Sequence, residues 1–104
     1  MREMIQMTER TARLLLAPNG VNINEVNVRA KLFRSTFTDF EVHFKLGNRT
    51  IIANGCDSQL VDAVADYVPE HFDEVYEFWK EYADEGVIGI IAEDILPSEI
   101  LSTL

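Results

Sequence analysis

Residues 40–53 carry the pattern on which the rest of the architecture is built, and they read FEVHFKLGNRTIIA. Apolar and polar side chains alternate over residues 40–46, which is the period of a half-buried strand. Gly47 and Asn48 follow as a two-residue turn with glycine in its first central position, as a type II′ hairpin prefers. The turn predicts a register in which Leu46 faces Arg49, Phe44 faces Ile51 and Val42 faces Ala53.

A third strand precedes this hairpin, because Val26, Val28, Ala30 and Leu32 alternate with polar residues. We therefore expect an α+β fold: a three-stranded antiparallel meander over residues 25–54, with amphipathic helices packed on one face. The other face is polar, and we expect it to be solvated or covered by a partner. Its basic side chains are Arg29, Lys31, Lys45 and Arg49. Cross-strand ion pairs are a better explanation for these cations than binding of nucleic acid.

An N-terminal helix is predicted over residues 2–16, within segment 1–17, because apolar positions recur at helical intervals. Residues 17–20, which read Ala-Pro-Asn-Gly, end it, since proline and Asn-Gly favour a turn. An extended conformation for residues 14–17 is the alternative.

Residues 57–85 predict acidic helices. Asp57 or Ser58 is a suitable N-cap for a helix that starts at Gln59. Pro69 either starts a second helix or kinks a continuous one. Gly86 lies where a left-handed C-cap is expected.

The C-terminal segment, residues 86–104, is harder to interpret. Residues 87–92 have the composition of a strand but also fit a helical stripe, and we favour the helix; Pro97 indicates a further helix start. The chain, residues 1–104, should form one domain. Its predicted core consists of Val26, Val28, Leu32, Phe40, Val42, Phe44, Ile51, Leu60, Val64, Phe72, Val75 and Trp79.

Composition excludes several classes of protein. With 47% hydrophobic residues, the chain is too apolar to be disordered. No stretch approaches the ~20 apolar residues of a membrane span, and the first residues lack the order of a signal peptide. The single cysteine, Cys56, excludes an internal disulfide and a multi-cysteine zinc site. We expect a soluble protein of the cytoplasm, where thiols stay reduced.

Charge is divided unequally along the chain. Residues 1–56 hold eight basic and five acidic side chains, a net +3, whereas residues 57–104 hold Lys80 against thirteen acids, a net −12. The net negative charge of residues 57–104 repels nucleic acid and anionic membranes, and it attracts a basic protein surface.

The acids of this second half recur at helical spacing. On one continuous helix, seven of them would form a ladder about 33 Å long. One interpretation is a docking surface for a basic partner, in one version a mimic of nucleic-acid phosphates; the other is an ordinary solvated helix face. The ladder consists of Asp62, Asp66, Glu70, Asp73, Glu77, Glu81 and Asp84.

Other chemical sites have weak signals. Cys56 precedes a helix but lies beside Asp57, which favours a buried structural cysteine over a reactive one. His71 shares a helix face with Glu74, yet an exposed histidine among carboxylates explains it better than a metal ligand. No phosphate-binding glycine loop and no nucleophile motif occurs. We expect no catalytic, cofactor or metal site.

These observations predict a small, acidic, non-enzymatic binding module that docks a basic protein surface. Small size, one cysteine and a concentrated acidic face resemble, as a type and across unrelated folds, phage-encoded inhibitors and the immunity proteins of bacterial toxins. Phe78 falls off the apolar stripe and is the expected aromatic anchor. The predicted partner-binding residues are Asp62, Asp66, Glu70, Asp73, Glu74, Glu77, Phe78, Glu81 and Asp84.

Two other functions are compatible with the sequence. The complementary halves predict head-to-tail assembly of a structural subunit into a homo-oligomer, to which the apolar residues 95–104 would contribute. An enzyme would have to depend on His71 and on carboxylate pairs such as Asp73 with Glu77. On an exposed helix face, water screens the coupling that would make two carboxylates an acid–base pair.

Overall fold

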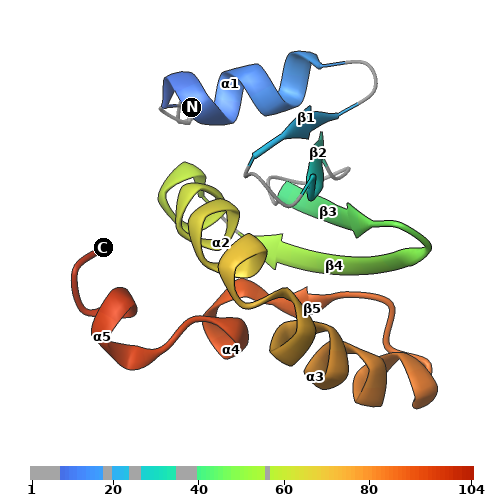
Figure 1. Ribbon diagram of the computed structural model, residues 1–104. Coiled ribbons are helices and arrows are strands. Elements are labelled where there is room, and N and C mark those ends of the chain that lie inside the picture. Colours follow the sequence, from blue (N-terminus) through green and yellow to red (C-terminus); the bar gives the residue numbers. More distant parts are fainter. Residues whose placement is uncertain (1–7, 18–19, 24–26, 35–39, 56) are drawn as a thin grey trace.

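The computed structural model describes residues 8–17, 20–23, 27–34, 40–55 and 57–104. It shows an α+β fold in which five strands form one mixed sheet, in the order β1-β2-β3-β4-β5, with helices packed against it (Figure 1). The strands are β1 (Val21–Asn22), β2 (Arg29–Arg34), β3 (Phe40–Leu46), β4 (Arg49–Gly55) and β5 (Ile90–Ile91). The helices are α1 (Glu9–Leu16), α2 (Ser58–Glu70), α3 (Phe72–Asp84), α4 (Ala92–Ile95) and α5 (Ser98–Leu101).

The predicted meander is present as β2, β3 and β4, which are antiparallel. Gly47 has a φ of +62° and Asn48 does not have a positive φ, in agreement with a type II′ turn. The prediction of three strands was wrong, because β1 adds antiparallel to β2 and β5 adds parallel to β4. The predicted hairpin register is confirmed, with Leu46 opposite Arg49, Phe44 opposite Ile51 and Val42 opposite Ala53.

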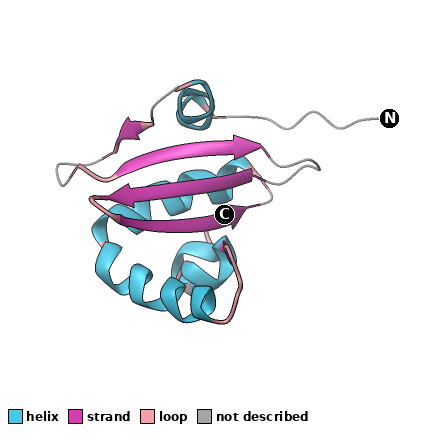
Figure 2. Ribbon diagram, turned by 90° about the vertical axis from the view of Figure 1, so that its right-hand side faces the viewer, coloured by secondary structure: helices cyan, strands magenta, loops and turns pink. Residues whose placement is uncertain are grey.

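Only one face of the sheet is buried. Ala30, Phe44 and Ile51 are on that face and have no exposed surface, and α2 lies behind it in Figure 2. Complete burial of each phenylalanine or isoleucine contributes about 1.5–3 kcal/mol. We call the opposite side the open face; in β2, β3 and β4 it consists of Arg29, Lys31, Phe33, Glu41, His43, Lys45, Thr50, Ile52 and Asn54.

The core is largely the predicted one. Trp79 is the exception: it is half-buried, and its indole N–H is directed toward the segment after α3. Leu14, Ile90, Ile95 and Leu96 are buried but were not predicted. The predicted residues that are buried are Val28, Leu32, Phe40, Val42, Phe44, Ile51, Leu60, Val64, Phe72 and Val75. Val26, Cys56 and residues 1–7 lie outside the described residues, so predictions that involve them remain predictions.

Helix α1 begins later than predicted. Thr8 is its N-cap, with extended backbone angles and a side chain that accepts a hydrogen bond from the Thr11 amide at 3.0 Å. The alternative of an extended segment over residues 14–17 was wrong, because the helix continues to Leu16. Its buried residues, Thr11 and Leu14, pack it against the rest of the fold.

The two acidic helices are separate, because the chain leaves helical geometry at His71 (φ −128°, ψ 32°). Pro69 lies in the last turn of α2 and starts no helix, so both sequence-based interpretations of Pro69 were wrong. The Asp57 cap is confirmed: its carboxylate accepts from the Leu60 amide at 2.9 Å, although the helix starts at Ser58.

The favoured helix over residues 87–92 was also wrong. Ile90 and Ile91 form β5, opposite Ala53 and Asn54 of β4. Gly89 favours this pairing, since a Cβ on it would lie 2.7 Å from Nδ2 of the Asn54 side chain. The helix start after Pro97 is confirmed as α5.

Candidate functional site

The predicted acidic ladder is divided at His71, and its first two carboxylates bind within the fold. Asp62 accepts a hydrogen bond of 2.8 Å from the hydroxyl of Thr11, which is fully buried. Asp66 forms an ion pair with Arg10 of α1. These two acids therefore attach α1 to α2.

Asp73, the first ladder acid of α3, also has a partner in the fold. Its carboxylate lies 2.7 Å from the guanidinium of Arg49, which stacks over the rings of Phe72 and Tyr76 at 5.0 and 5.5 Å. The assignment of Arg49 to the polar face of the sheet was wrong. Because Arg49 is paired with Leu46 on the side of the helices, it reaches α3 and fixes it on the end of β4.

All five of the predicted partner-binding acids on α3 are exposed, and four of them are not part of the Arg49 pair: Glu74, Glu77, Glu81 and Asp84. Among the residues that the structure describes, none of the four forms an ion pair. Glu85 continues the acidic surface past the end of the helix. The charge that is available to a partner is thus concentrated on α3.

Phe78 does not have the predicted role of an exposed anchor. It is half-buried, packs against the core, and meets the ring of Tyr82 edge-on with the centroids 5.1 Å apart. Its side chain belongs to the packing of α3.

Three exposed apolar residues lie in the segment after α3 instead. Val87, Ile88 and Ile91 are 43%, 73% and 54% exposed. We call residues 87–91 the apolar segment. It follows Gly86, whose φ of +91° closes a Schellman motif at the end of α3.

The apolar segment is held in a defined conformation at both ends. At its start the Val87 amide donates to the Tyr82 carbonyl at 2.9 Å, and the indole N–H of Trp79 donates to the Ile88 carbonyl at 3.0 Å. At its end Ile90 is buried and paired with β4. Ile88 is therefore exposed on an ordered backbone, in the segment that joins the end of α3 to β5 (Figure 1).

A groove of about 590 Å³ lies between α2 and the C-terminal residues. His71 and Tyr67 stack in it at 4.1 Å, and His71 Nδ1 donates to the Tyr67 carbonyl at 3.0 Å. Two carboxylates of its lining, Asp62 and Asp66, are bound to α1. Its lining consists of Gln59, Asp62, Ala63, Asp66, Tyr67, Glu70, His71, Ile100, Thr103 and Leu104.

His71 itself is half-buried, so the prediction that it is exposed was wrong. Within the described ranges, no three His, Cys, Asp or Glu side chains lie close enough to hold a metal ion. In the same part of the chain, no helix has the length and hydrophobicity needed to cross a membrane.

Comparisons of the chain with protein-family models, curated proteins and solved structures gave no match. The candidate site is therefore described from its own chemistry.

Sequence reasoning found the acids of this surface but missed its apolar component. The spacing of Val87, Ile88 and Ile91 predicts one face of a helix, where the three residues would be buried together. The isolated Gly89 was the available signal, since glycine inside a β-branched run marks a close approach between backbones.

Proposed function

We propose that this chain is a non-enzymatic binding module that docks a basic surface of another protein. The docking surface combines the exposed acids of α3 with the apolar segment. The observation that carries the proposal is Ile88, which is 73% exposed although its backbone is fixed by Trp79. A single exposed apolar residue is ordinary, whereas a fixed group of three beside a charged helix is typical of an interaction site.

The two components have different roles in binding. Glu77, Glu81 and Asp84 would accelerate the encounter by attracting a positively charged surface. Ile88 and Ile91 would then lose contact with water against the partner and slow dissociation. The natural targets of such a surface are proteins that handle nucleic acids, such as a nuclease or a polymerase, whose basic site the bound module would block. Mimicry of a longer row of phosphates is not part of the proposal, because the ladder is interrupted at His71.

Affinity capture from host lysate, followed by binding kinetics with the purified partner, tests the proposal. The acidic variant carries Glu77→Lys, Glu81→Lys and Asp84→Lys. Its matched control carries Glu9→Lys, Asp94→Lys and Glu99→Lys, which change the net charge equally but lie off α3. We expect the control to retain the partner, and the acidic variant to lose it chiefly through slower association.

The apolar component has its own pair of variants. Ile88→Ser should speed dissociation, whereas Leu16→Ser, at a position that is 80% exposed on α1, should leave it unchanged. A partner that binds all four variants alike, or whose association rate is the same at low and high salt, would contradict the proposal.

A further inference from the structure

Four exposed acids of α3 form one straight row along the helix, which we call the acidic stripe. They follow one another at steps of three, four and three residues and are Glu74, Glu77, Glu81 and Asp84. At 3.6 residues per turn, these positions fall within an arc of about 80° and extend over about 15 Å. The buried residues of α3, Phe72 and Val75, lie on the opposite side of the helix. The acidic stripe is therefore directed to solvent.

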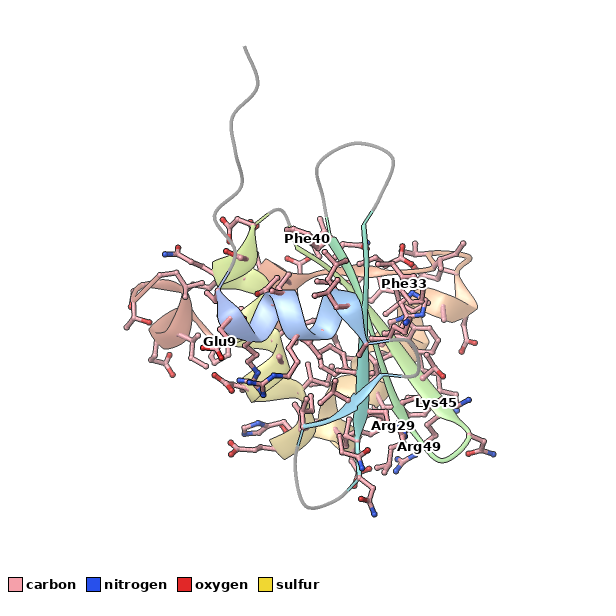
Figure 3. The ribbon with its side chains drawn as sticks, turned by 90° about the horizontal axis from the view of Figure 1, so that it is seen from above. Glu9, Arg29, Phe33, Phe40, Lys45 and Arg49 are labelled. Atoms are coloured by element: carbon pink, nitrogen blue, oxygen red, sulfur yellow. The ribbon has the colours of Figure 1, made fainter. Side chains whose placement is uncertain are left out.

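The cations of the described chain leave the acidic stripe without a counter-charge. The labelled cations of Figure 3, Arg29, Lys45 and Arg49, come from the strands. In the described part of the chain, α3 has one ion pair, between Asp73 and Arg49, and Asp73 is outside the stripe. Like charges one turn apart destabilise a helix. A partner can therefore supply cations to the stripe without displacing an ion pair of this chain.

The steps of the acidic stripe indicate which kind of element fits it. A helix that carries cations at the same steps of three, four and three residues meets all four acids over the same distance of about 15 Å. Residues on one face of a strand are about 6.6 Å apart, so four of them need about 20 Å and fall out of step with the acids. Steps of three and four residues are also those of the seam along which two helices pack side by side. The stripe thus favours a helical partner over an extended one.

The apolar segment indicates the direction in which such a helix runs. The segment is attached to the C-terminal end of α3, because the Val87 amide donates to the Tyr82 carbonyl. The C-terminal end of a helix carries partial negative charge, which attracts the positive N-terminal end of a neighbouring helix. A partner helix that runs antiparallel to α3 therefore brings its first turn to the end where Ile88 is 73% exposed.

We propose that the partner binds this chain through a basic amphipathic helix that lies antiparallel to α3. Its cations are spaced three and four residues apart and pair with the acidic stripe, and apolar side chains in its first turn cover Ile88 and Ile91. The inference rests on the proposed function, to which it adds the element that the partner presents and the direction of that element. A partner that presented a basic strand or loop would satisfy the proposed function but not this inference.

Three synthetic peptides of identical composition test the proposal in a binding titration with the full chain. Each has about 18 residues, long enough for a helix, with blocked ends, an alanine background, four lysines and two leucines. The forward peptide has its leucines in the first turn and its lysines at steps of three, four and three residues. The reverse peptide is the same sequence written backwards, which keeps these steps and moves the leucines to the last turn. The alternating peptide has its lysines at steps of two residues.

We expect the forward peptide to bind at least about tenfold more tightly than either of the other two peptides. Its helix content, measured by circular dichroism, should rise on binding. Fluorescence anisotropy with a labelled peptide gives the three dissociation constants, and repetition at high salt should weaken all of them.

Variants of the protein assign the contacts. Glu74→Lys with Glu81→Lys should weaken binding of the forward peptide at least about tenfold. The matched control, Glu9→Lys with Glu99→Lys, changes the net charge equally at positions off α3 and should leave binding unchanged. Ile88→Ser should weaken the forward peptide and not the reverse peptide, so that the difference between the two disappears.

The outcomes separate this inference from the proposed function. Equal binding of the forward and alternating peptides, tighter binding of the reverse peptide, or no binding of any peptide at millimolar concentration would overturn the helical partner. The proposed function fails on another result, when the partner captured from lysate is indifferent to the α3 acids. A captured partner that needs those acids, but is protected from hydrogen exchange in a strand or loop, would leave the function in place and overturn this inference.

Discussion

The guanidinium of Arg10 donates a hydrogen bond of 3.3 Å to the backbone carbonyl of Ala65, four residues before Pro69. Proline has no N–H, so the carbonyl of Ala65 lacks the donor that an ordinary helical residue at position 69 would supply. Arg10 reaches across from α1 to supply one, and it pairs with Asp66 at the same time. Helix α1 is thus fastened at the place where α2 has lost a hydrogen bond.

This relationship predicts that the cost of removing Arg10 depends on Pro69. We expect Arg10→Ala to lower the free energy of unfolding by about 1–2 kcal/mol, with most of the loss from the carbonyl because the ion pair is exposed. In a Pro69→Ala background residue 69 supplies its own N–H, and the cost should fall. Urea denaturation of the four proteins of this double-mutant cycle measures the difference. Equal costs in both backgrounds would show that the contact with Ala65 is incidental.

Thr11 should be sensitive to loss of its hydroxyl. The residue is fully buried, donates to Asp62 at 2.8 Å and accepts from Thr8 at 3.0 Å. Thr11→Val keeps the shape but leaves Asp62 without this donor, and should destabilise the fold by about 1–3 kcal/mol. Thr11→Ser retains the hydroxyl and serves as the control in thermal unfolding. If the serine variant were the less stable of the two, packing of the methyl group would matter more than the hydrogen bond.

Arg49 and Asp73 should contribute unequally although they form one ion pair. Asp73 is 84% exposed, so Asp73→Ala should cost less than about 1 kcal/mol and lose its effect at high salt. Arg49→Ala also removes the stacking on Phe72 and Tyr76 and should cost more, and Arg49→Lys should restore little of it. Denaturation at two salt concentrations distinguishes the contribution of the ion pair from that of the stacking. A fully stable lysine variant would mean that stacking is unimportant.

Gly89 should accept a side chain only if its neighbours on β4 move. A Cβ there would lie 2.7 Å from Nδ2 of the Asn54 side chain and 3.1 Å from Ile52 Cγ2. We expect Gly89→Ala to cost about 1–3 kcal/mol by pushing β5 away from β4. The double variant with Asn54→Ala should recover part of this loss in urea denaturation. If the double variant recovered no stability, the steric clash would lie with Ile52 and not with Asn54.

Trp79 should control the order of the apolar segment. Trp79→Phe keeps an aromatic ring but removes the donor to the Ile88 carbonyl, at a cost of about 1 kcal/mol. The change should speed amide hydrogen exchange in residues 87–89 and weaken binding of a basic partner, with exchange in β3 unaltered. Unchanged exchange in this segment would show that the Schellman motif at Gly86 is sufficient to order it.

The meander could be predicted because its information is local. Alternation over residues 40–46 and the positive φ that Gly47 supplies are properties of neighbouring residues, and together they specify one register. The α2 cap at Asp57 is predictable for the same reason.

The errors concern residues whose state depends on distant parts of the chain. Whether Ile90 enters a strand depends on the unpaired edge of β4, and whether Asp62 faces water depends on Thr11 of α1. Periodicity predicts the face of a helix but not which element covers it, so it does not reveal that Phe78 packs against the core. The acids of α3 are exposed, as their spacing predicts, because the buried residues of the helix, Phe72 and Val75, lie on another side of it.

The parallel pairing of β5 with β4 also determines the stage of folding at which the apolar segment becomes ordered. The β3–β4 hairpin joins strands that are adjacent in sequence, whereas α2 and α3 separate β4 from β5 along the chain. Contacts between distant residues form late in folding because closing the chain between them costs entropy. The surface around Ile88 is consequently a property of the finished molecule, and the partner that we propose for it would distinguish a completely folded chain from a nascent or partly unfolded one.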